Sequence, residues 1–390
     1  MTNVIFACLW YRDKKRTWSG TAWSLRQALD PYLKITDFTI TDPCYRKVIR
    51  KLKKYKGLAP RPPLRDRLRL KKLCTARDAR GRSKVFQFGD WPCGERYASY
   101  LYQDLSVSAI LRLRQQDPQA YRYCEYDKVP LKELKRRAAA QLACYRQSEA
   151  VFTMSGWLLD HLVTECGIPA EKVYAVGGGI NVDAGLIRPG KKENRRILFV
   201  GRNFVRKGGV IVVEAFRILR EQYLPEAELY LAGASAEEIR GSLRQAGVPA
   251  EETDMQGICL VGEVKEEKLA EYYNLCDVFC MPSYFEAYGL VFAEALVFGL
   301  PCIGRDKFAM REIIEDGCTG KLFSGEDPGQ LAEDMWELLT KSHYREEVAR
   351  RRERYLAEYS WDRVARRICD VMENNDRKRR NQDQYHSTGI

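Results

Sequence analysis

Two successive runs of short apolar strands alternating with helices constrain the fold of this chain most strongly. Strand-like segments of the first run lie at residues 4–10, 35–40, 85–88, 150–153 and 173–176. The second run restarts at Ile197, with further strand patterns at 228–232, 259–261, 278–281 and 301–303. Short apolar strands separated by helices are typical of parallel sheets covered on both faces. The sequence therefore predicts an α/β protein with two Rossmann-like, doubly wound domains.

The predicted domain boundaries follow changes in composition. Residues 187–196 are mostly polar and contain Pro189-Gly190, which predicts a linker between an N-terminal domain at 1–186 and a C-terminal domain at 197–360. An amphipathic pattern at 361–373 predicts a last helix. The remaining residues, 374–390, are polar and charged, and we expect them to be disordered.

Composition and the cysteines indicate a folded cytoplasmic protein. Hydrophobic residues make up 45% of the 390 residues, and no apolar run approaches the roughly 20 residues of a membrane span. The first apolar run precedes its cations, Arg12 to Arg16, which is the reverse of a signal peptide. The 13 cysteines form no C-x-x-C pair, so we expect reduced, mostly structural thiols. Cys276 and Cys280 lack a second pair or a nearby histidine, and no metal site is expected there.

Two glutamates lie eight positions apart after a buried strand of the second run. The segment SYFEAYGLVFAEALVFGL places Glu286 in a loop at the carboxyl end of the sheet and Glu294 on the helix that follows. Gly289 and Leu290, at the start of that helix, offer amides to a phosphate group. Glu286 is then expected to reach a transferred sugar and Glu294 the hydroxyls of a nucleotide ribose. The alternative is a solvated loop acid plus a helix acid stabilised by the helix dipole.

A glycine turn with two spaced cations follows the first strand of the same run. In GRNFVRKG, Arg202 offers a fork to two phosphate oxygens and Lys207 a mobile point charge, which is suited to gripping a diphosphate. The alternative makes the cations of this turn ordinary surface charges, and for Arg206 we favour that interpretation.

The segments GRNFVRKGG, YLAGAS and FEAYGLVFAEAL together resemble the retaining glycosyltransferases of family four, which have the GT-B fold. The resemblance implies two domains facing across a cleft, with Glu286 and Glu294 as the E-x7-E motif and Arg202 and Lys207 as diphosphate-binding cations. It also implies that the nucleotide base rests against the backbone near Val264, and that the helix at 361–373 crosses back to the N-terminal domain.

The first half of the chain is a less standard match. Trp18-Ser19-Gly20-Thr21 resembles the W-S-G-T loop of one branch, in which the glycine, here Gly20, lies under the donor phosphates. Many relatives place a histidine facing the sugar, but this chain has three histidines and none falls there. Asp104 in YQDLS resembles the aspartate of that branch and is expected to orient or deprotonate the acceptor hydroxyl. Alternatively, Asp104 caps the following helix.

The sequence contains no D-x-D, the usual carboxylate clamp for a metal-bound diphosphate. We therefore expect a metal-independent reaction without a cofactor, in which the nucleotide-diphosphate sugar is a substrate and Arg202, Lys207 and helix amides neutralise the leaving group.

A basic segment at residues 46–84 holds 17 Lys or Arg against two acidic residues in a chain of net charge +12. Apolar residues recur among its cations at helical spacing, which is typical of a helix lying on an anionic membrane surface. The protein would then be peripheral on the inner face of the membrane. The alternative is a basic loop and helix whose charges are simply solvated. No recognition motif supports a nucleic-acid partner.

These observations favour a hexosyltransferase that moves a sugar from a nucleotide sugar to a glycan or lipid-linked acceptor with retention of configuration. Two alternatives stay open: an inactive scaffold at a membrane surface, and a sugar-nucleotide epimerase or hydrolase on the same fold. The sequence does not specify the nucleotide, the sugar, the acceptor or the oligomeric state.

Overall fold

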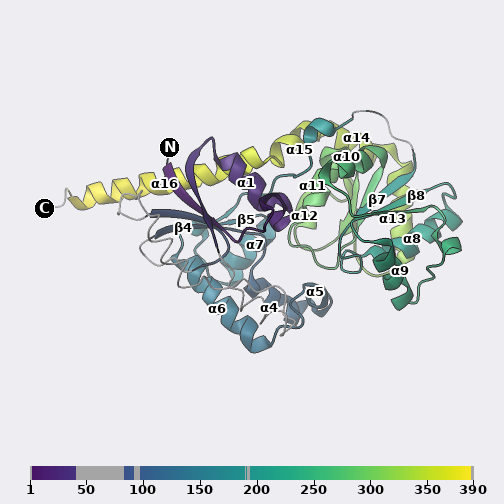
Figure 1. Ribbon diagram of the computed structural model, residues 1–390, viewed down its shortest axis with the longest axis horizontal. Coiled ribbons are helices and arrows are strands. Elements are labelled where there is room, and N and C mark those ends of the chain that lie inside the picture. Colours follow the sequence, from purple (N-terminus) through teal and green to yellow (C-terminus); the bar gives the residue numbers. More distant parts are fainter. Residues whose placement is uncertain (1, 41–82, 92–96, 189, 191–193, 388–390) are drawn as a thin grey trace. The chain divides into compact units, whose positions relative to one another are not determined.

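The computed structural model describes residues 2–40, 83–91, 97–188, 190 and 194–387, and these divide into two compact units. The first unit contains residues 1–179 together with 360–390, and the second contains residues 180–359. Each unit has a parallel sheet of its own with helices packed around it (Figure 1). Most of the basic segment, residues 46–82, lies outside the described residues.

The first sheet has six strands in the order β2-β1-β3-β4-β5-β6, and all of them are parallel. Its strands are β1 (Thr2–Cys8), β2 (Leu33–Thr39), β3 (Ser83–Phe88), β4 (Tyr97–Gln103), β5 (Ala150–Thr153) and β6 (Val173–Ala175). Aromatic residues of neighbouring strands stack across the sheet, as Phe6 does on Phe86 with ring centroids 5.4 Å apart. The strand order reverses between β1 and β3, because β2 lies on one side of β1 and β3 on the other, so the topological switch point of this sheet lies there.

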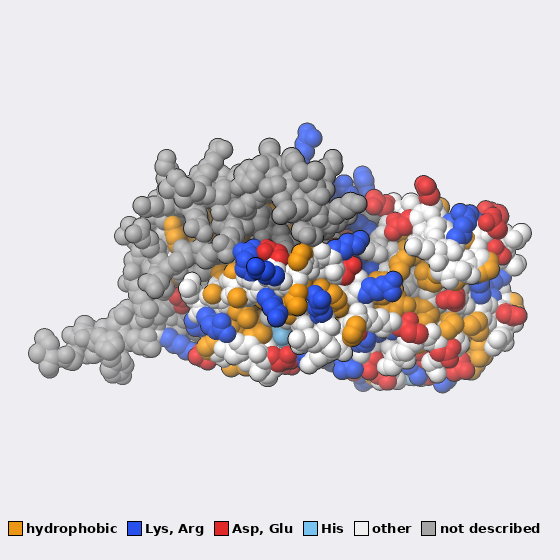
Figure 2. Space-filling view, turned by 90° about the horizontal axis from the view of Figure 1, so that it is seen from below, with side chains coloured by type: hydrophobic (Ala, Val, Ile, Leu, Met, Phe, Trp, Pro, Cys, Tyr) orange, Lys and Arg blue, Asp and Glu red, His pale blue; other side chains and the backbone are white. Residues whose placement is uncertain are grey.

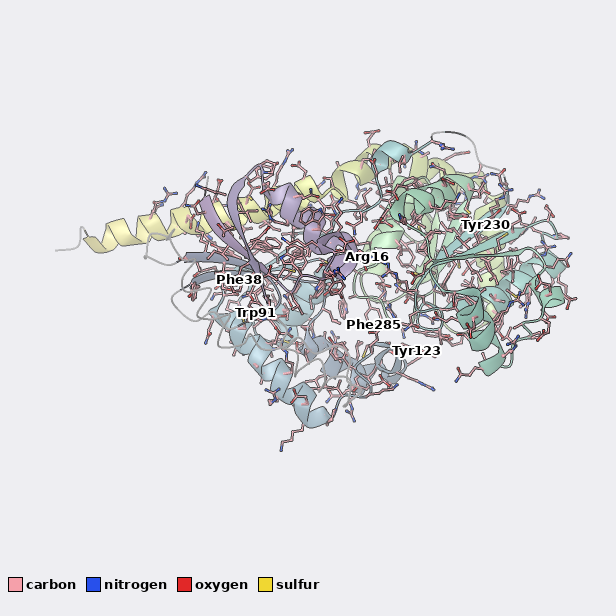
Figure 3. The ribbon with its side chains drawn as sticks, in the orientation of Figure 1. Arg16, Phe38, Trp91, Tyr123, Tyr230 and Phe285 are labelled. Carbon is pink, nitrogen blue, oxygen red and sulfur yellow. The ribbon has the colours of Figure 1, made fainter. Side chains whose placement is uncertain are left out.

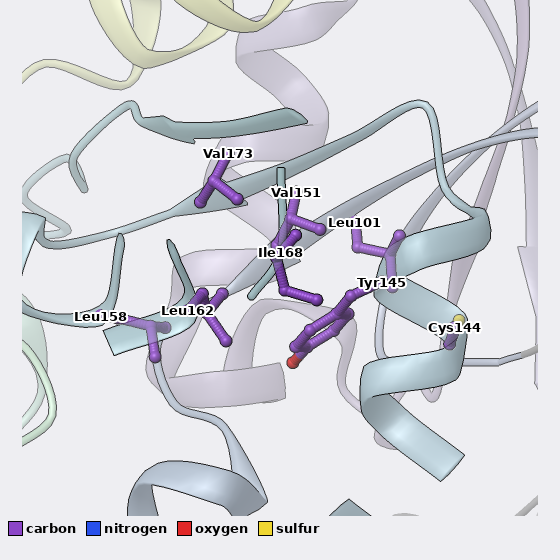
Figure 4. Packing of buried hydrophobic residues seen from close by; sticks show 8 residues of the cluster. All are labelled: Leu101, Cys144, Tyr145, Val151, Leu158, Leu162, Ile168 and Val173. Carbon is purple, nitrogen blue, oxygen red and sulfur yellow. The ribbon is translucent and has the colours of Figure 1, made fainter. Parts of the chain in front are cut away.

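The helices of the first unit bury their apolar stripes against this sheet. They are α1 (Thr21–Leu29), α4 (Val107–Gln116), α5 (Pro118–Tyr123), α6 (Leu131–Gln147), α7 (Gly156–Asp160) and α16 (Trp361–Ser387). One cluster shows how the packing works: Tyr145 of α6 and Leu158 of α7 meet Leu101 and Val151 of the sheet, and all are fully buried (Figure 4). Burying such side chains is the main favourable contribution to the stability of each unit.

The second sheet also has six parallel strands, in the order β12-β11-β10-β7-β8-β9. Its strands are β7 (Arg196–Val200), β8 (Glu228–Ala232), β9 (Ile258–Gly262), β10 (Val278–Met281), β11 (Cys302–Arg305) and β12 (Gly320–Phe323). Numbered within the unit, this order is the 3-2-1-4-5-6 arrangement of dinucleotide-binding folds, with its switch point between β7 and β10.

The helices of the second unit connect these strands. They are α8 (Gly209–Gln222), α9 (Ala236–Gln245), α10 (Glu266–Leu275), α11 (Leu290–Val297), α12 (Met310–Ile313), α13 (Pro328–Thr340), α14 (Ser342–Arg350) and α15 (Arg352–Glu358). α11 differs from the others because six of its eight residues are buried, Glu294 among them.

The chain passes between the units earlier than the predicted linker at 187–196. The division falls between Gly179 and Ile180, and the polar run belongs to the second unit. Its backbone is held there by side chains: the Arg188 N–H donates to Asn274 Oδ1 at 2.8 Å, and the Asn194 N–H donates to Asp277 Oδ2 at 3.1 Å. The polar run is therefore anchored to the second unit at Arg188 and Asn194 and is not the connection between the units.

The last helix, α16, belongs to the first unit and extends well beyond its predicted end. The expectation of a disordered tail from residue 374 is wrong for residues 374–387, which continue the helix. Asp376 forms an ion pair with Lys84, a lysine of β3 whose side chain is only 5% exposed, and Asn375 donates to the Glu149 carbonyl. A buried ammonium group needs such a partner, so the polar residues of this segment are part of the folded structure.

Two strands, β4 and β12, were absent from the sequence prediction, but both sheets keep the predicted parallel βα pattern. In the described part of the chain, ten cysteines carry free thiols, and no group of three His, Cys, Asp or Glu could hold a metal ion. None of the described helices is long and apolar enough to cross a membrane. On the face shown in Figure 2, charges of both signs are interspersed with hydrophobic side chains.

Candidate functional site

The loops that follow β7 and β10 meet at the switch point of the second sheet. β7 and β10 are neighbours, and the chain leaves them toward opposite halves of the sheet. Ligands of open parallel sheets bind outside the carboxyl ends of the strands at such a point. Arg202 and Lys207 follow β7, and Glu286 follows β10, so the predicted site residues of these two loops lie where a ligand is expected.

Glycine lets the two loops approach each other closely. Gly208 has a φ of +79°, and a Cβ at this position would lie 2.5 Å from the Pro282 carbonyl oxygen. A larger residue would therefore push apart the loops after β7 and β10. α8 begins directly after this glycine, so its N-terminus also lies at the site.

Lys207 and Glu286 form an ion pair between these loops. Their side chains are 12% and 15% exposed, so both charges are largely removed from solvent. Burial lowers the pKa of Lys207, and the Glu286 carboxylate opposes that shift. Because few water molecules contact these two charges, an incoming phosphate can bind Lys207 and an incoming hydroxyl can bind Glu286 with little loss of hydration.

Gly289 is the N-cap of α11 and has a left-handed conformation, with a φ of +94°. A Cβ at this position would lie 2.8 Å from the Phe292 ring. The helix thus starts one residue later than Gly289, close to the predicted start. The first N–H groups of a helix have no partner within it, and Leu290 supplies the first of them. Gly289 also lies next to Glu286, since its added Cβ would be 3.2 Å from Glu286 Cγ.

Glu294 lies on the same helix but is far more buried, at 4% exposure. Its carboxylate accepts hydrogen bonds from the Asn181 N–H and the Tyr273 hydroxyl, each at 3.1 Å. Burial raises the pKa of Glu294 to about 7, and these hydrogen bonds oppose the shift. Asn181 therefore bonds directly to the second glutamate of the E-x7-E motif.

Arg202 is exposed, but Arg206 is not the ordinary surface charge that we predicted. Arg206 Nη1 donates to the Phe285 carbonyl at 2.9 Å, and its own carbonyl accepts from the Tyr284 N–H at 2.9 Å. Phe285, labelled in Figure 3, is buried one residue before Glu286. Sequence reasoning missed this contact because it depends on how the topology brings the two loops together.

Val264 lies in the short loop between β9 and α10 and is half-buried. The Gly233 N–H after β8 donates to the Gly262 carbonyl at 2.8 Å, which joins the ends of β8 and β9. The predicted base-contacting residue therefore lies at the same carboxyl edge of the sheet, two strands from β7.

In the first unit, Gly20 ends a turn in which Trp18 and Ser19 also have left-handed backbones. The φ of Gly20 is +92°, and α1 begins at the next residue. The Trp18 ring packs edge-on against Phe88, with centroids 5.9 Å apart, so the W-S-G-T loop lies at the end of β3 beside the switch point of the first sheet.

Asp104 directly follows β4 and is half-buried. The alternative that it caps the next helix is wrong, because Ser106 is the N-cap of α4 and accepts from the Ala109 N–H at 3.1 Å. The Asp104 carboxylate contributes to raising the pKa of Tyr126, after the larger effect of burial.

Residues 187–355 match the family model described as "Glycosyl transferases group 1". The match includes the β7 and β10 loops, α11 and both glutamates. The second unit is a group 1 glycosyltransferase domain. This confirms the family-four resemblance predicted from the sequence.

Relatives and solved structures agree with this family. The chain is 30% identical, over 242 residues, to a D-inositol 3-phosphate glycosyltransferase of Xylanimonas cellulosilytica, and the match covers 57% of this chain and 56% of that protein. The chain thus spans about half the length of the curated relatives it matches.

Similar solved structures include sucrose-phosphate synthase from Thermosynechococcus elongatus, with a TM-score of 0.66 at 18% identity, covering 95% of this chain and 98% of that one. Anabaena HepE in complex with UDP gives a TM-score of 0.66 at 12% identity, covering 96% of this chain and 100% of that one. These likenesses extend over both units and confirm the predicted fold class, two Rossmann-like domains of the GT-B type.

Proposed function

We propose that this protein is a retaining hexosyltransferase that uses a nucleotide-diphosphate sugar and no metal ion. The observation that carries the proposal is the Lys207–Glu286 pair at the switch point of a group 1 glycosyltransferase domain. A cation for the diphosphate and a carboxylate for the sugar hydroxyls are thus held side by side. That juxtaposition suits a donor whose sugar is joined directly to its phosphate.

In this proposal the leaving diphosphate is stabilised by fixed positive groups. Lys207 and Arg202 bind its oxygens, and the amides at the start of α11, from Gly289 and Leu290, add partial positive charge. Because these groups are in place before the reaction, they stabilise the developing charge without reorganisation. The absence of a D-x-D sequence supports a reaction that needs no metal clamp.

Glu286 and Glu294 then bind opposite ends of the donor. Glu286 contacts the transferred sugar. Glu294 accepts hydrogen bonds from the ribose hydroxyls, either in addition to those from Asn181 and Tyr273 or in place of them. Val264 contacts the base through its backbone. Donors that carry UDP are the first to test, because HepE, of similar fold, was solved in complex with UDP.

The first unit supplies the acceptor side of the proposal. Gly20 approaches the phosphates, and Asp104 orients or deprotonates the acceptor hydroxyl. As the bond from the anomeric carbon to the diphosphate oxygen breaks, the acceptor oxygen bonds to the same face of the sugar and its proton passes to Asp104 or to the departing phosphate. The acceptor is a glycan or a lipid-linked glycan, reached at a membrane surface through residues 46–84.

The deciding experiment is a donor screen with EDTA present. We expect one nucleotide sugar to raise the melting temperature and to be hydrolysed slowly without an acceptor. An epimerised sugar with the nucleotide still attached would support the epimerase alternative. No response to any nucleotide or nucleotide sugar would contradict the proposal and favour the inactive scaffold.

Site variants test the assigned residues. Arg202→Ala combined with Lys207→Ala should reduce turnover by roughly 100-fold or more, since single well-aimed donors contribute a few kcal/mol to stabilising a transition state. Glu294→Ala should weaken donor binding. Lys268→Ala is the control, because Lys268 pairs with Glu271 on the exposed face of α10 in the same unit. Unchanged turnover in the double variant would disprove the site.

A further inference from the structure

The loop that carries Glu286, residues 282–286, is held from both sides by arginines whose role the proposed function does not assign. One arginine, Arg206, comes from the loop after β7. The other, Arg305, ends β11, on the far side of β10. A role for these arginines in holding Glu286 rests on the proposed function, in which Glu286 contacts the sugar of the donor.

Arg206 bonds to the loop through both its side chain and its backbone. Its guanidinium donates to the Phe285 carbonyl at 2.9 Å. Its carbonyl accepts from the Tyr284 N–H at 2.9 Å and from the Ser283 hydroxyl at 3.2 Å. Three consecutive residues are thereby fixed directly before Glu286, while the next residue along, Lys207, pairs with Glu286 itself.

Arg305 holds the other side of the loop, and its side chain is only 2% exposed. Nε lies 3.3 Å from the Pro282 carbonyl, and Nη1 donates to Glu326 Oε1 at 2.8 Å. The guanidinium lies over the Tyr284 ring, 4.4 Å from its centroid, and the Tyr284 hydroxyl donates to Glu326 at 2.8 Å. Arg305, Tyr284 and Glu326 therefore form a closed network, in which no member can move without breaking contacts with the other two.

A third support comes from Phe308, which has a left-handed backbone with a φ of +55°. Its ring packs edge-on against Phe285 at 5.4 Å. A non-glycine residue in this conformation costs free energy, and such residues persist where the surroundings hold them in place. Stored strain is common next to functional loops, and here it lies against the residue that precedes Glu286.

Stability alone does not account for this arrangement. Arg206 Nε and Arg305 Nη2 are both buried and have no hydrogen-bond partner among the described residues. A buried guanidinium with an unsatisfied N–H is costly, and apolar side chains would fill the same space at lower cost. The two arginines instead contribute charge-assisted hydrogen bonds to two backbone carbonyls of the loop, those of Phe285 and Pro282.

We propose that Arg206 and Arg305 are positioning residues that fix Glu286 for the sugar of the donor. Their contacts reach residues 282–285 and Glu326. Glu294 is bonded separately, to Asn181 and Tyr273. Glu286 and Glu294 are therefore held by different contacts, and changes at Arg206 alter which sugar is accepted.

The test compares binding of a nucleoside diphosphate with binding of the corresponding nucleotide sugar. UDP with UDP-glucose and GDP with GDP-mannose are the probes, measured by calorimetry on the full chain. Arg206 contacts the loop before Glu286, and its charge also acts on Lys207, so we expect Arg206→Ala to change the affinity for the diphosphate by less than the affinity for the nucleotide sugar. The additional affinity contributed by the sugar should be lost.

Turnover should fall as well, because misplacing a contacting group by about 1 Å can cost on the order of 100-fold. The decrease should appear in kcat, while the Kd of the diphosphate changes less, and Arg206→Lys, which retains a donor and the charge, should restore part of kcat. Glu326 is exposed, and Glu326→Gln replaces its ion pair with Arg305 by a weaker neutral contact. This variant should shift sugar preference in the same direction as Arg206→Ala, but by less.

Arg217→Ala is the matched control. Arg217 lies on α8 of the same unit, and its guanidinium also donates to backbone carbonyls, those of Pro249 and Asp254, at 2.7 and 3.0 Å. If Arg206→Ala and Arg217→Ala weaken binding of both probes alike, Arg206 is merely structural and the inference fails. Unchanged sugar discrimination in Arg206→Ala also overturns it. If wild type binds none of the nucleotide sugars of the donor screen, the proposed function itself has failed.

Discussion

At the scale of single residues, Glu294 is the clearest case of a group whose properties are set by burial. Its pKa is raised to about 7 because its carboxylate is buried, and the hydrogen bonds from Asn181, Tyr273 and Val182 oppose this shift only in part. In the unfolded chain the same carboxyl titrates near 4.5. The folded protein therefore holds a proton that the unfolded chain has released across that range of pH.

The consequence is a loss of stability as pH rises from about 4.5 to about 7, where the unfolded chain binds fewer protons than the folded one. Glu294→Gln should remove this contribution, which is on the order of 1–3 kcal/mol. The free energy of unfolding, measured in urea between pH 5 and 8, should fall less steeply in the variant than in wild type.

Glu337→Gln is the comparison for this prediction. Burial opposes the shift, but hydrogen bonds from Tyr344, Lys341 and Lys321 lower the pKa of Glu337 from 4.5 to about 2, so its contribution to stability is lost as pH falls from about 4.5 to about 2. The variant should be less stable at every pH from 5 to 8, with the slope unchanged. A slope unaltered by Glu294→Gln would show that Glu294 is ionised throughout this range.

The residues of the candidate site differ in how far the sequence could predict them. Lys207, Glu286 and Glu294 could be found because a strand pattern placed them at a sheet edge and a motif gave their spacing. Arg206 could not, because its partner is a carbonyl 79 residues further along the chain, and any residue type has a carbonyl. Only the neighbouring placement of β7 and β10 brings that contact about.

At the scale of elements, the start of α11 is where backbone conformation and binding meet. Gly289 has a φ of +94°, and its added Cβ would overlap the Phe292 ring. Gly289→Ala should destabilise the protein by roughly 1–3 kcal/mol through backbone strain. It should also weaken binding of UDP or GDP, because the amides at the start of the helix shift away from the phosphate.

Gly241→Ala provides the control for this change. Gly241 lies inside α9, where an added Cβ meets nothing within 4 Å, so alanine should stabilise the helix by about 0.5–1 kcal/mol. The melting temperature should fall in Gly289→Ala and rise in Gly241→Ala. Calorimetry should show weaker nucleotide binding only in Gly289→Ala. Full nucleotide binding by Gly289→Ala would remove α11 from the proposed phosphate site.

Element prediction succeeded where strands are apolar and failed where they are not. β5, β8 and β10 were predicted with their observed bounds because each is a compact apolar run. β4, with the sequence YASYLYQ, mixes small and polar residues with tyrosines, and it becomes a strand because β3 and β5 pair with it on both sides. β12 has only four residues, GKLF, which give too short a pattern to read.

At the scale of the whole molecule, the two units were predictable but their boundary was not. Two successive runs of strands alternating with helices predict two doubly wound sheets. Polar composition alone does not distinguish a connection between domains from a loop anchored to one of them. The chain passes between the units at 179–180 and returns at 359–360. Beside the first crossing, Gly179 lies so near Trp361 that an added Cβ would be 2.6 Å from its ring.

The first unit is therefore discontinuous, and its stability should depend on the end of the chain. α16 buries Val364, Ile368 and Met372 in this unit, and Asp376 is the partner of the buried Lys84. Asp362 also accepts from the Tyr32 hydroxyl at 2.6 Å. Removing residues 360–390 would expose this apolar surface and leave the Lys84 ammonium buried without its partner, which typically costs several kcal/mol.

We expect this truncation to act on one unit only. Hydrogen exchange followed by mass spectrometry should show faster exchange in β1, α1 and β3, while the strands from β7 to β12 exchange as in the full chain. The truncated protein should still bind the nucleotide found in the donor screen, because Lys207, Glu286 and Glu294 all lie in the second unit. Equal loss of protection in both sheets would mean that the two units unfold together, and unchanged protection throughout would mean that α16 contributes little to the first unit.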